Sequence, residues 1–245
     1  EGQADGDGEA PIVFFHGVGM GLVMYLSFVS QLLGACRKHG KERTIILVDM
    51  DHVSMRFRSS HPTVDNIADD VVALVTDVLG LPQMEISGHS YGTFCCARLI
   101  QRHPAVVKSA VLADPVCFLL ILPHILRNFL VRPPRDPAAH GLAAFVRDVV
   151  RIAFCSREEG IAFTFSRSFY WHQVCLWMDQ LPPRTTVVLS GDDELIPIKP
   201  LYRYFTRAAG PGSPRLVFFE GVNHAGFLGN PYLLARVVGL LAEAA

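Results

Sequence analysis

Short apolar runs separated by polar or glycine-containing turns recur along this chain of 245 residues. Runs this short, flanked by turn residues and rich in aliphatic side chains, are typical of strands buried in a parallel sheet. The runs lie at residues 11–15, 43–49, 84–87, 106–113, 185–190 and 215–219.

Segments with helical spacing lie between these runs. The strongest periodicity is at residues 63–79, where Gly80 and Pro82 then end the pattern. Another helical stretch reaches Lys38, and its apolar positions Leu22, Leu26, Val29 and Leu33 are expected on one side. Further helices are expected after residue 92, at 198–208 and at 230–244. This alternation predicts an α/β fold with a doubly wound, mostly parallel sheet covered on both faces.

The alternation stops between residues 115 and 181, a segment rich in aromatic residues, proline and arginine that contains helical patterns only. We call this stretch the cap segment. We expect it to be a helical cap or lid inserted after the strand that ends at Ala113, over the carboxyl edge of the sheet. Residues 11–114 and 182–245 would form the core, and the acidic, glycine-rich residues 1–10 a flexible tail.

Composition excludes several classes of protein. The net charge is −1 and the isoelectric point is near 6.9, without the basic stripe of a nucleic-acid binder. The six cysteines are scattered, with neither a CxxC pair nor zinc spacing, which favours free thiols in a reducing, intracellular compartment. The apolar run 116–131 is interrupted by polar residues and is too short to span a bilayer, although contact with a membrane surface stays compatible with the sequence. Because the chain begins at Glu1, we expect a fragment.

The turn Gly88-His89-Ser90-Tyr91-Gly92 follows one predicted strand and opens a predicted helix. This G-x-S-x-G pattern places a serine hydroxyl at the tip of a strained bend, where it can act as a nucleophile. Glycine is required at both ends because a side chain would collide with the opposing strand or helix. The bare pattern also occurs by chance as a glycine-serine turn, but the strand before it and the helix after it favour the nucleophile.

A serine nucleophile needs a base, and the base needs an orienting group. Asp193 follows the strand at 185–190, and His224 follows the strand at 215–219, so both loops leave the carboxyl edge that carries Ser90. Asp192 is an alternative acid. Asp114, which ends the strand at 106–113, is the reserve acid.

These motifs resemble the α/β-hydrolase family, and the resemblance covers residues 11–245 apart from the cap segment. It implies a triad of Ser90, Asp193 and His224, with Asp193 preferred over Asp192 because the family's acid usually stands four residues before a proline such as Pro197. It also implies that the backbone amides of Val18 and Tyr91 stabilise the oxyanion. The residues expected to support these motifs are His16, Gly17, Gly19, Gly88, His89 and Gly92. The family often has a Pro-Gly-x-Gly-x-Ser loop where this chain has residues 51–56, so that wall of the pocket is undefined.

The resemblance implies an esterase-like or lipase-like serine hydrolase without a metal or an organic cofactor. An aromatic cap favours a small-molecule substrate with an apolar acyl group, and Phe169 and Trp171 are candidates for the pocket wall. The alternatives are a ligand-binding receptor or interaction module on the same fold, and lyase or cofactor-free oxidative chemistry on the same triad. A dinucleotide-binding fold is the weakest alternative, since residues 17–21 and Asp49 fit its pattern but Leu22 replaces the third glycine.

Overall fold

The computed structural model describes residues 9–38, 43–57, 61–207, 210 and 213–243. All strand pairs of its six-stranded sheet are parallel, in the order β2-β1-β3-β4-β5-β6. The strands are β1 (Ile12–Phe15), β2 (Ile45–Val48), β3 (Met84–His89), β4 (Val107–Ala113), β5 (Arg184–Ser190) and β6 (Arg215–Phe219). The α/β fold with a mostly parallel sheet is therefore confirmed. Because every strand runs in the same direction, all carboxyl ends meet at one edge.

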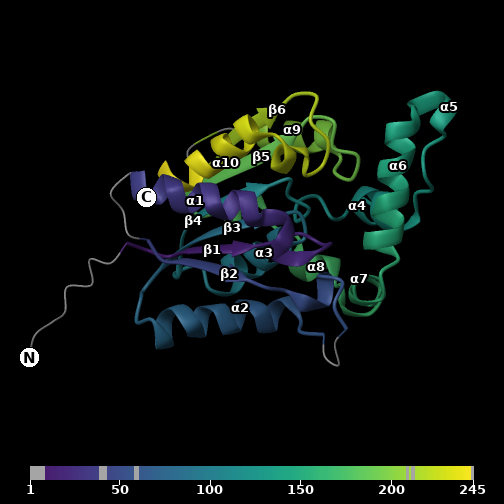
Figure 1. Ribbon diagram of the computed structural model, residues 1–245. Helices are drawn as coiled ribbons and strands as arrows, with labels where there is room; N and C mark the ends of the chain where they lie inside the picture. The colour runs from purple at the N-terminus through teal and green to yellow at the C-terminus, as the bar shows by residue number, and fades with distance from the viewer. Residues whose placement is uncertain (1–8, 39–42, 58–60, 208–209, 211–212, 244–245) are drawn as a thin grey trace, which may run out of the picture.

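Helices cover both faces of the sheet (Figure 1). The helices of the core are η1 (Gly21–Tyr25), α1 (Leu26–Lys38), η2 (Asp51–Val53), α2 (Val64–Ala73), η3 (Leu74–Val78), α3 (Gly92–Arg102), α9 (Ile198–Arg207), η8 (Gly226–Gly229) and α10 (Pro231–Glu243). Side chains alternate along β1, so Val13 and Phe15 pack in the hydrophobic cluster of α2 and α3, whereas Ile12 and Phe14 pack in that of α1 and α10. This two-sided burial explains why the strands are almost continuously apolar.

Two expectations about burial were wrong. Helix α1 buries Phe28, Leu32 and Cys36, while Leu26 and Leu33 of the predicted apolar side are exposed. Strand β2 is only partly buried along its length, because it is the edge strand of the sheet. In both cases the predicted secondary structure was correct, but the extent and the side of burial depend on which elements pack against the helix or strand.

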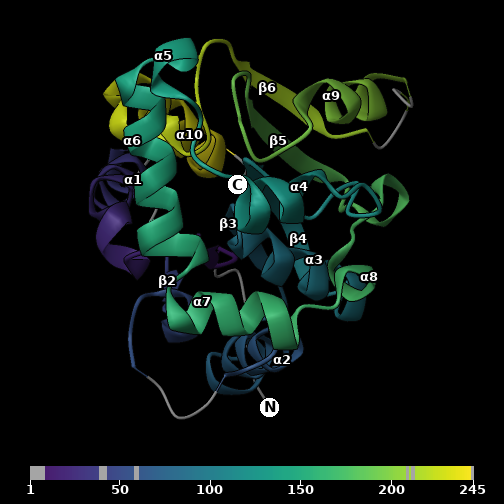
Figure 2. The same cartoon turned by 90° about the vertical axis from the view of Figure 1, so that its right-hand side faces the viewer.

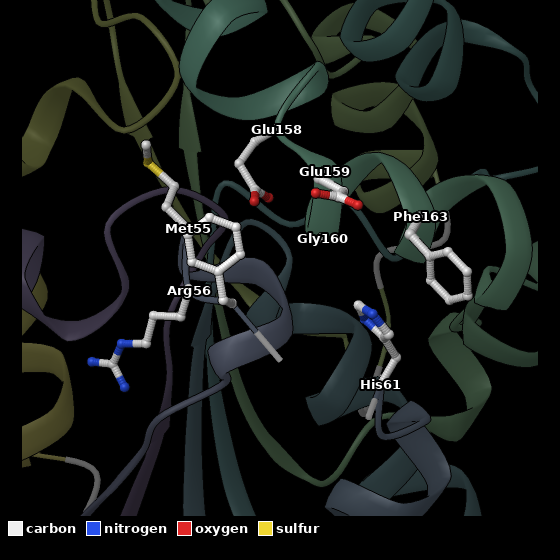
Figure 3. A pocket seen from close by; sticks show the side chains of 8 residues that line it. Met55, Arg56, His61, Glu158, Glu159, Gly160 and Phe163 are labelled. Carbon is white, nitrogen blue, oxygen red and sulfur yellow. The ribbon is translucent and has the colours of Figure 1, made fainter. Parts of the chain in front are cut away.

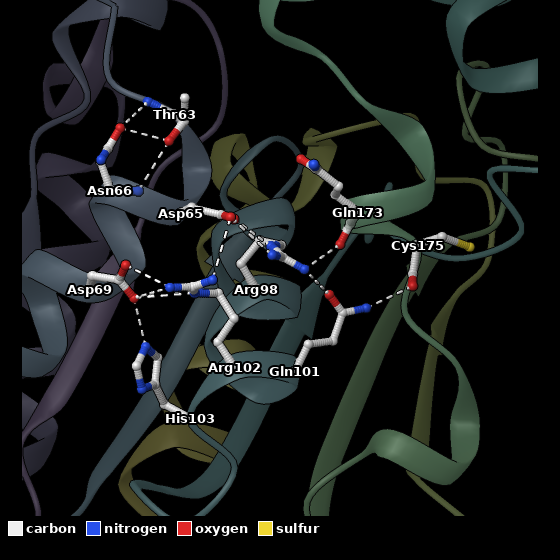
Figure 4. Close-up of polar contacts among 10 residues, drawn as sticks. All are labelled: Thr63, Asp65, Asn66, Asp69, Arg98, Gln101, Arg102, His103, Gln173 and Cys175. Atoms are coloured by element: carbon white, nitrogen blue, oxygen red, sulfur yellow. Dashed lines mark hydrogen bonds and ion pairs between the residues drawn. The ribbon is translucent and has the colours of Figure 1, made fainter.

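Ion pairs tie α2 to α3, the helix that follows Ser90 (Figure 4). The guanidinium of Arg98 donates to both oxygens of Asp65, and Arg102 pairs with Asp69 at 2.7 Å. Arg98 also donates to the carbonyl of Gln173, and Gln101 donates to that of Cys175. These bonds therefore attach the returning end of the cap segment to α3, the helix that follows Ser90.

The cap segment contains only short helices among the described residues 115–181. They are α4 (His124–Leu126), η4 (Arg127–Val131), α5 (Pro137–His140), α6 (Leu142–Arg151), η5 (Ile152–Ser156), α7 (Glu159–Phe163), η6 (Thr164–Ser168), α8 (Trp171–Val174) and η7 (Met178–Gln180). The departing and returning chains meet where the amide of Leu176 donates to the carbonyl of Cys117. Figure 2 looks onto the end of the molecule where α6 and α7 lie.

Residues 1–8 of the predicted tail lie outside the described residues, while Ala10 is buried and its carbonyl accepts hydrogen bonds from Arg43. All six cysteines are free thiols. Among the helices of the described residues, none has the length and apolar character needed to cross a membrane.

Candidate active site

Ser90 sits on a strained turn between β3 and α3. Its φ angle is +51°, in the left-handed region that non-glycine residues rarely adopt. The turn is tight enough to exclude side chains on either side of it. A Cβ on Gly92 would lie 2.2 Å from the carbonyl oxygen of Phe15, and one on Gly88 would lie 2.8 Å from the backbone of Gly92. Glycine at both positions therefore permits the bend that holds the Ser90 hydroxyl above the sheet edge.

The side chains of Ser90, His224 and Asp193 form one chain of hydrogen bonds. The Oγ atom of Ser90 lies 2.9 Å from Nε2 of His224. On the other side of the ring, Nδ1 lies 2.6 Å from Oδ2 of Asp193. The structure thus brings together the three predicted site residues, although Ser90 and His224 are 134 positions apart in the sequence.

Asp193 is the acid in contact with the imidazole. Its second oxygen, Oδ1, accepts hydrogen bonds from the amides of Leu195 and Ile196, at 2.8 and 3.0 Å. Asp192, the alternative acid, has an exposed side chain. The carboxylate of Glu194 instead accepts a hydrogen bond from the backbone amide of His224 at 3.3 Å. Of these three consecutive acids, Asp193 therefore has the geometry of an orienting group.

Asp114, the reserve acid, holds the backbone around the site. Its fully buried carboxylate accepts hydrogen bonds from the amide and hydroxyl of Ser190 and, at 2.8 Å, from the amide of Ala225. Ala225 follows His224 and has a φ angle of +61°, so this bond supports a strained residue of the histidine loop. Burial raises the pKa of Asp114 to about 6, while the charge of His224 acts in the opposite direction.

The carboxylates around His224 determine its protonation. Burial by itself lowers the pKa of His224, but the charge and hydrogen bond of Asp193, together with Asp114 and Glu194, raise it to about 9. Ligand atoms of Asp114, Asp193 and His224 lie within 4.8 Å of one another, a spacing that would suit a metal ion. The same side chains form the hydrogen bonds described above.

The loop after β1 lies against the serine. The His16 ring is fully buried, accepts the amide of Met50 at Nε2, and therefore donates from Nδ1 to the carbonyl of Gly17. The amide of Gly19 donates to the carbonyl of Val53. His16 thus organises the loop and does not contact the nucleophile. No hydrogen bond within the described parts of the chain uses the amide of Val18 or Tyr91, the two predicted oxyanion donors.

His89 is buried beside the nucleophile and belongs to the packing of this loop. Its Nδ1 atom lies 2.6 Å from the hydroxyl of Tyr25, which also accepts the amide of Gly17. Burial first, and then the charges of His224 and His16, hold the pKa of His89 well below the usual value. A neutral His89 therefore holds the hydroxyl of Tyr25 in place by a hydrogen bond. Tyr25 in turn holds Gly17, and with it the loop after β1, next to Ser90.

A small apolar cavity of about 20 Å³ opens beside Ser90. Its lining is Val18, Ser90, Tyr91, Phe94, Val116, Ile125, Phe129, Phe165 and Leu195. Phe169 does not line this cavity but packs behind it, with its ring 5.1 Å from Phe94 and 5.4 Å from Phe165. Trp171 is 43% exposed and is absent from the lining. The cap segment therefore reaches the cavity at Ser90 through α4, η4 and η6, which the sequence did not single out.

A second, larger cavity of about 490 Å³ lies between the cap segment and the loop that follows β2 (Figure 3). Met55 and Arg56, from the loop at residues 51–56, form one side, and Glu158, Glu159 and Phe163 form the other. The His61 ring stacks on Phe163 with centroids 4.4 Å apart. The segment that departs from the family pattern thus forms a wall of this outer cavity. Asp49, which a dinucleotide-binding fold would use for a ribose, is instead bound by Arg56 at 2.6 Å.

Comparisons with known proteins agree with this architecture. A family model described as the alpha/beta hydrolase fold matches residues 10–155. The abhydrolase domain-containing protein abhd-5.2 of Caenorhabditis elegans is 26% identical over 126 residues, a match that covers 50% of this chain and only 27% of that protein.

Solved structures are similar over nearly the whole chain. A monoacylglycerol lipase from Paleococcus ferrophilus has a TM-score of 0.61 at 16% identity, covering 96% of both chains. A meta-cleavage product hydrolase from Pseudomonas fluorescens has a TM-score of 0.64 at 17% identity, covering 96% of this chain and 92% of that one. At these identities the likeness concerns the fold.

Proposed function

The chain belongs to the alpha/beta hydrolase fold family, and from this premise we propose that it is a serine hydrolase that cleaves a carboxylic ester or a related acyl compound. The observation that carries the proposal is the chain of hydrogen bonds from Asp193 through His224 to the strained Ser90. A serine in an ordinary turn has no reason to meet a partly buried histidine that is itself oriented by a carboxylate.

In the first half of the reaction, Oγ of Ser90 forms a bond to the carbonyl carbon of the substrate. The proton of the hydroxyl passes to Nε2 of His224, 2.9 Å away, while Asp193 stabilises the imidazolium across a 2.6 Å hydrogen bond. The carbonyl electron pair moves onto oxygen. When the tetrahedral intermediate collapses, the bond to the leaving group breaks, and that group takes the proton from His224. The acyl group is left on Ser90.

The negative oxygen of the intermediate requires donors that are fixed in advance. The amides of Val18 and Tyr91 suit this role because both residues line the cavity at Ser90 and their amides are not engaged elsewhere among the described residues. Tyr91 also begins the first turn of α3, whose N-terminal dipole favours negative charge. Removal of one such donor costs about 10²–10³ in kcat in related chemistry.

In the second half, a water molecule takes the place of the leaving group. It gives a proton to Nε2 of His224 and its oxygen attacks the acyl carbon, after which the acid product leaves and Ser90 recovers its proton. The chain of hydrogen bonds serves both halves because His224 acts first as a base and then as an acid.

The cavity at Ser90 bears on the substrate. Its lining is apolar, and its free volume of about 20 Å³ is that of roughly one water molecule, so only the smallest acyl groups enter without movement of the lining side chains. The leaving group would then extend out of this cavity, which shares no lining residue with the larger outer cavity. We therefore propose that short-chain esters are turned over faster than long-chain esters.

The test is labelling with a fluorophosphonate probe together with turnover of p-nitrophenyl esters from acetate to decanoate. Ser90→Ala should abolish both the labelling and the turnover. Ser109→Ala, which removes a buried hydroxyl from β4, is the control and should retain labelling. Turnover of Ser90→Ala near the wild-type rate would refute the mechanism. A folded wild-type protein that neither labels nor turns over any ester would instead point to a ligand-binding or interaction module on the same fold.

A further inference from the structure

Helix α6 of the cap segment is amphipathic in the reverse of the usual sense. A surface helix of a globular protein normally turns its apolar side inward and its charges toward water. Here Asp148 is 1% exposed and Arg151 faces the interior, whereas the valines of the same helix are exposed. The helix projects at one end of the molecule, away from the sheet (Figure 1).

Charged groups attach the inner side of α6 to the protein. The Asp148 carboxylate accepts hydrogen bonds from the guanidinium groups of Arg132 and Arg135, at 2.9 and 2.8 Å, and from the amide of Arg135. Arg135 also pairs with Glu194 at 3.4 Å, and Arg151 donates to the carbonyl of Arg132. Asp148 and Arg151 on the inner side of the helix are therefore bound to the protein rather than turned toward solvent.

The outer side of α6 and η5 forms an apolar stripe, with side chains between 39% and 69% exposed. The stripe consists of Leu142, Val146, Val149, Val150 and Phe154. Its spacing of three to four residues keeps the members on one side of the helix over about 20 Å. At the same edge of the sheet, the loop leaving β1 exposes Met20, Val23 and Met24. Large apolar groups gathered in this way mark an interaction surface.

Charge distinguishes between the kinds of partner. The cap segment has seven arginines and five carboxylates, a net charge of +2, so the rest of this chain of net charge −1 carries −3. Two exposed arginines border the stripe: Arg157, and Arg147, whose guanidinium also lies 3.9 Å from the carboxylate of Glu194. An apolar helix side flanked by arginine is the pattern of a helix that lies in the interface of an anionic membrane.

The dimensions argue against a second copy of the chain as the partner. One helix side of about 20 Å by 10 Å presents roughly 200 Å². A stable protein–protein interface buries about 800 Å² on each partner. A lipid surface needs only a few immersed apolar side chains together with neighbouring cations.

We infer that the apolar stripe is a membrane-contact surface, which seats the protein on anionic lipid with α6 lying in the plane of the interface. The stripe enters the boundary between headgroups and acyl chains to about 5–10 Å, and the bordering arginines contact the headgroup phosphates. The carboxyl edge of the sheet, where Ser90 shares a cavity with side chains of the cap segment, then faces the lipid side. This inference is independent of the proposed function, since it concerns where the protein binds and not what it cleaves.

The test is flotation with two kinds of vesicle, one of phosphatidylcholine alone and one with about a third phosphatidylglycerol. The wild type should float with the anionic vesicles, and less so as salt is raised. Val146→Glu combined with Val150→Glu should lower the bound fraction roughly tenfold or more. Val78→Glu, which adds one such negative charge at a 73% exposed valine at the end of η3, should leave binding unchanged. Arg147→Ala should weaken binding to anionic vesicles only.

Unfolding of the double glutamate variant would be detected by circular dichroism. Leu142→Ser combined with Phe154→Ser would then replace it, with the same reduction expected. The inference is overturned if the wild type floats with neither vesicle, or if the stripe variants float as the wild type does. It is also overturned if sedimentation shows a wild-type dimer that the stripe variants dissociate, since the stripe would then join two copies of the chain.

Discussion

Asp193→Asn tests the proposed chemistry most directly, because the structure fixes how the new side chain must be oriented. In the wild type, Oδ1 of Asp193 accepts the amides of Leu195 and Ile196, and Oδ2 faces Nδ1 of His224. Asparagine has nearly the same shape but only one accepting oxygen. That oxygen has to take the Oδ1 position, since an NH₂ group there would oppose two N–H donors at 2.8 and 3.0 Å. The NH₂ group of the asparagine is therefore directed at His224.

The consequence is the wrong tautomer of the imidazole. A donor opposite Nδ1 requires Nδ1 to be the acceptor, so the ring proton moves to Nε2. Nε2 then donates to the Ser90 hydroxyl across 2.9 Å and cannot remove its proton. The same substitution in another serine-hydrolase triad lowers kcat about 10⁴-fold, equivalent to about 5 kcal/mol of transition-state stabilisation. We expect a loss of this order here, with the fold retained.

The assay is kcat for p-nitrophenyl acetate, with thermal melting to verify folding. Asp192→Asn is the matched control: its carboxylate is exposed, and we expect a change of no more than roughly twofold. A loss below about tenfold in Asp193→Asn would refute the reasoning. If Asp193→Asn stayed active while Asp114→Asn lost activity, the acid would be Asp114. A carboxylate oxygen of Asp114 lies within 4.8 Å of a ring nitrogen of His224.

Three further predictions follow from the geometry. His224 must be neutral to act as a base, and the neighbouring carboxylates raise its pKa. We therefore expect kcat/KM to fall as the pH falls, with a midpoint above about 6.5, the usual pKa of histidine. A pH–rate profile with its midpoint at 6 or below would contradict this. Phe165→Ala enlarges the cavity at Ser90 and should raise the octanoate-to-acetate ratio of kcat/KM roughly tenfold. Trp171→Ala is the control, because Trp171 lies outside that lining, and it should leave the ratio unchanged. Equal effects in the two variants would contradict the assigned acyl pocket. Gly92→Ala places a Cβ 2.2 Å from a backbone oxygen and should prevent stable folding. Gly34→Ala, at an open position in a helix, should instead raise the free energy of unfolding by about 1 kcal/mol. A wild-type melting temperature for Gly92→Ala would show that the turn can relax.

Local sequence determined the parts of this protein that depend on neighbours in the chain. Apolar runs are sufficient to specify the strands, though not how deeply each is buried. The strand, glycine turn and helix around Ser90 predict the elbow because its steric limits involve residues within a few positions. Since parallel strands share one carboxyl edge, the sequence also predicted that the loops carrying Asp193 and His224 would come close to Ser90.

Tertiary structure decided everything that depends on a distant partner. The proline at position 197 was the only sequence signal that separated Asp193 from Asp192, whereas in space the imidazole and two backbone amides select Asp193. Periodicity gave α1 its helical state but the wrong buried side, because that side is set by contact with α10 and the sheet.

The cap segment shows the same limit most clearly. Its aromatic residues were visible in the sequence, but whether Phe165 or Trp171 reaches the nucleophile depends on how the short helices pack. In α6 the usual rule is reversed, since Asp148 is buried with two arginines from the loop that follows η4, while the valines face outward. Burial of a charge is favourable only where partners converge on it, and that convergence is a property of the folded chain.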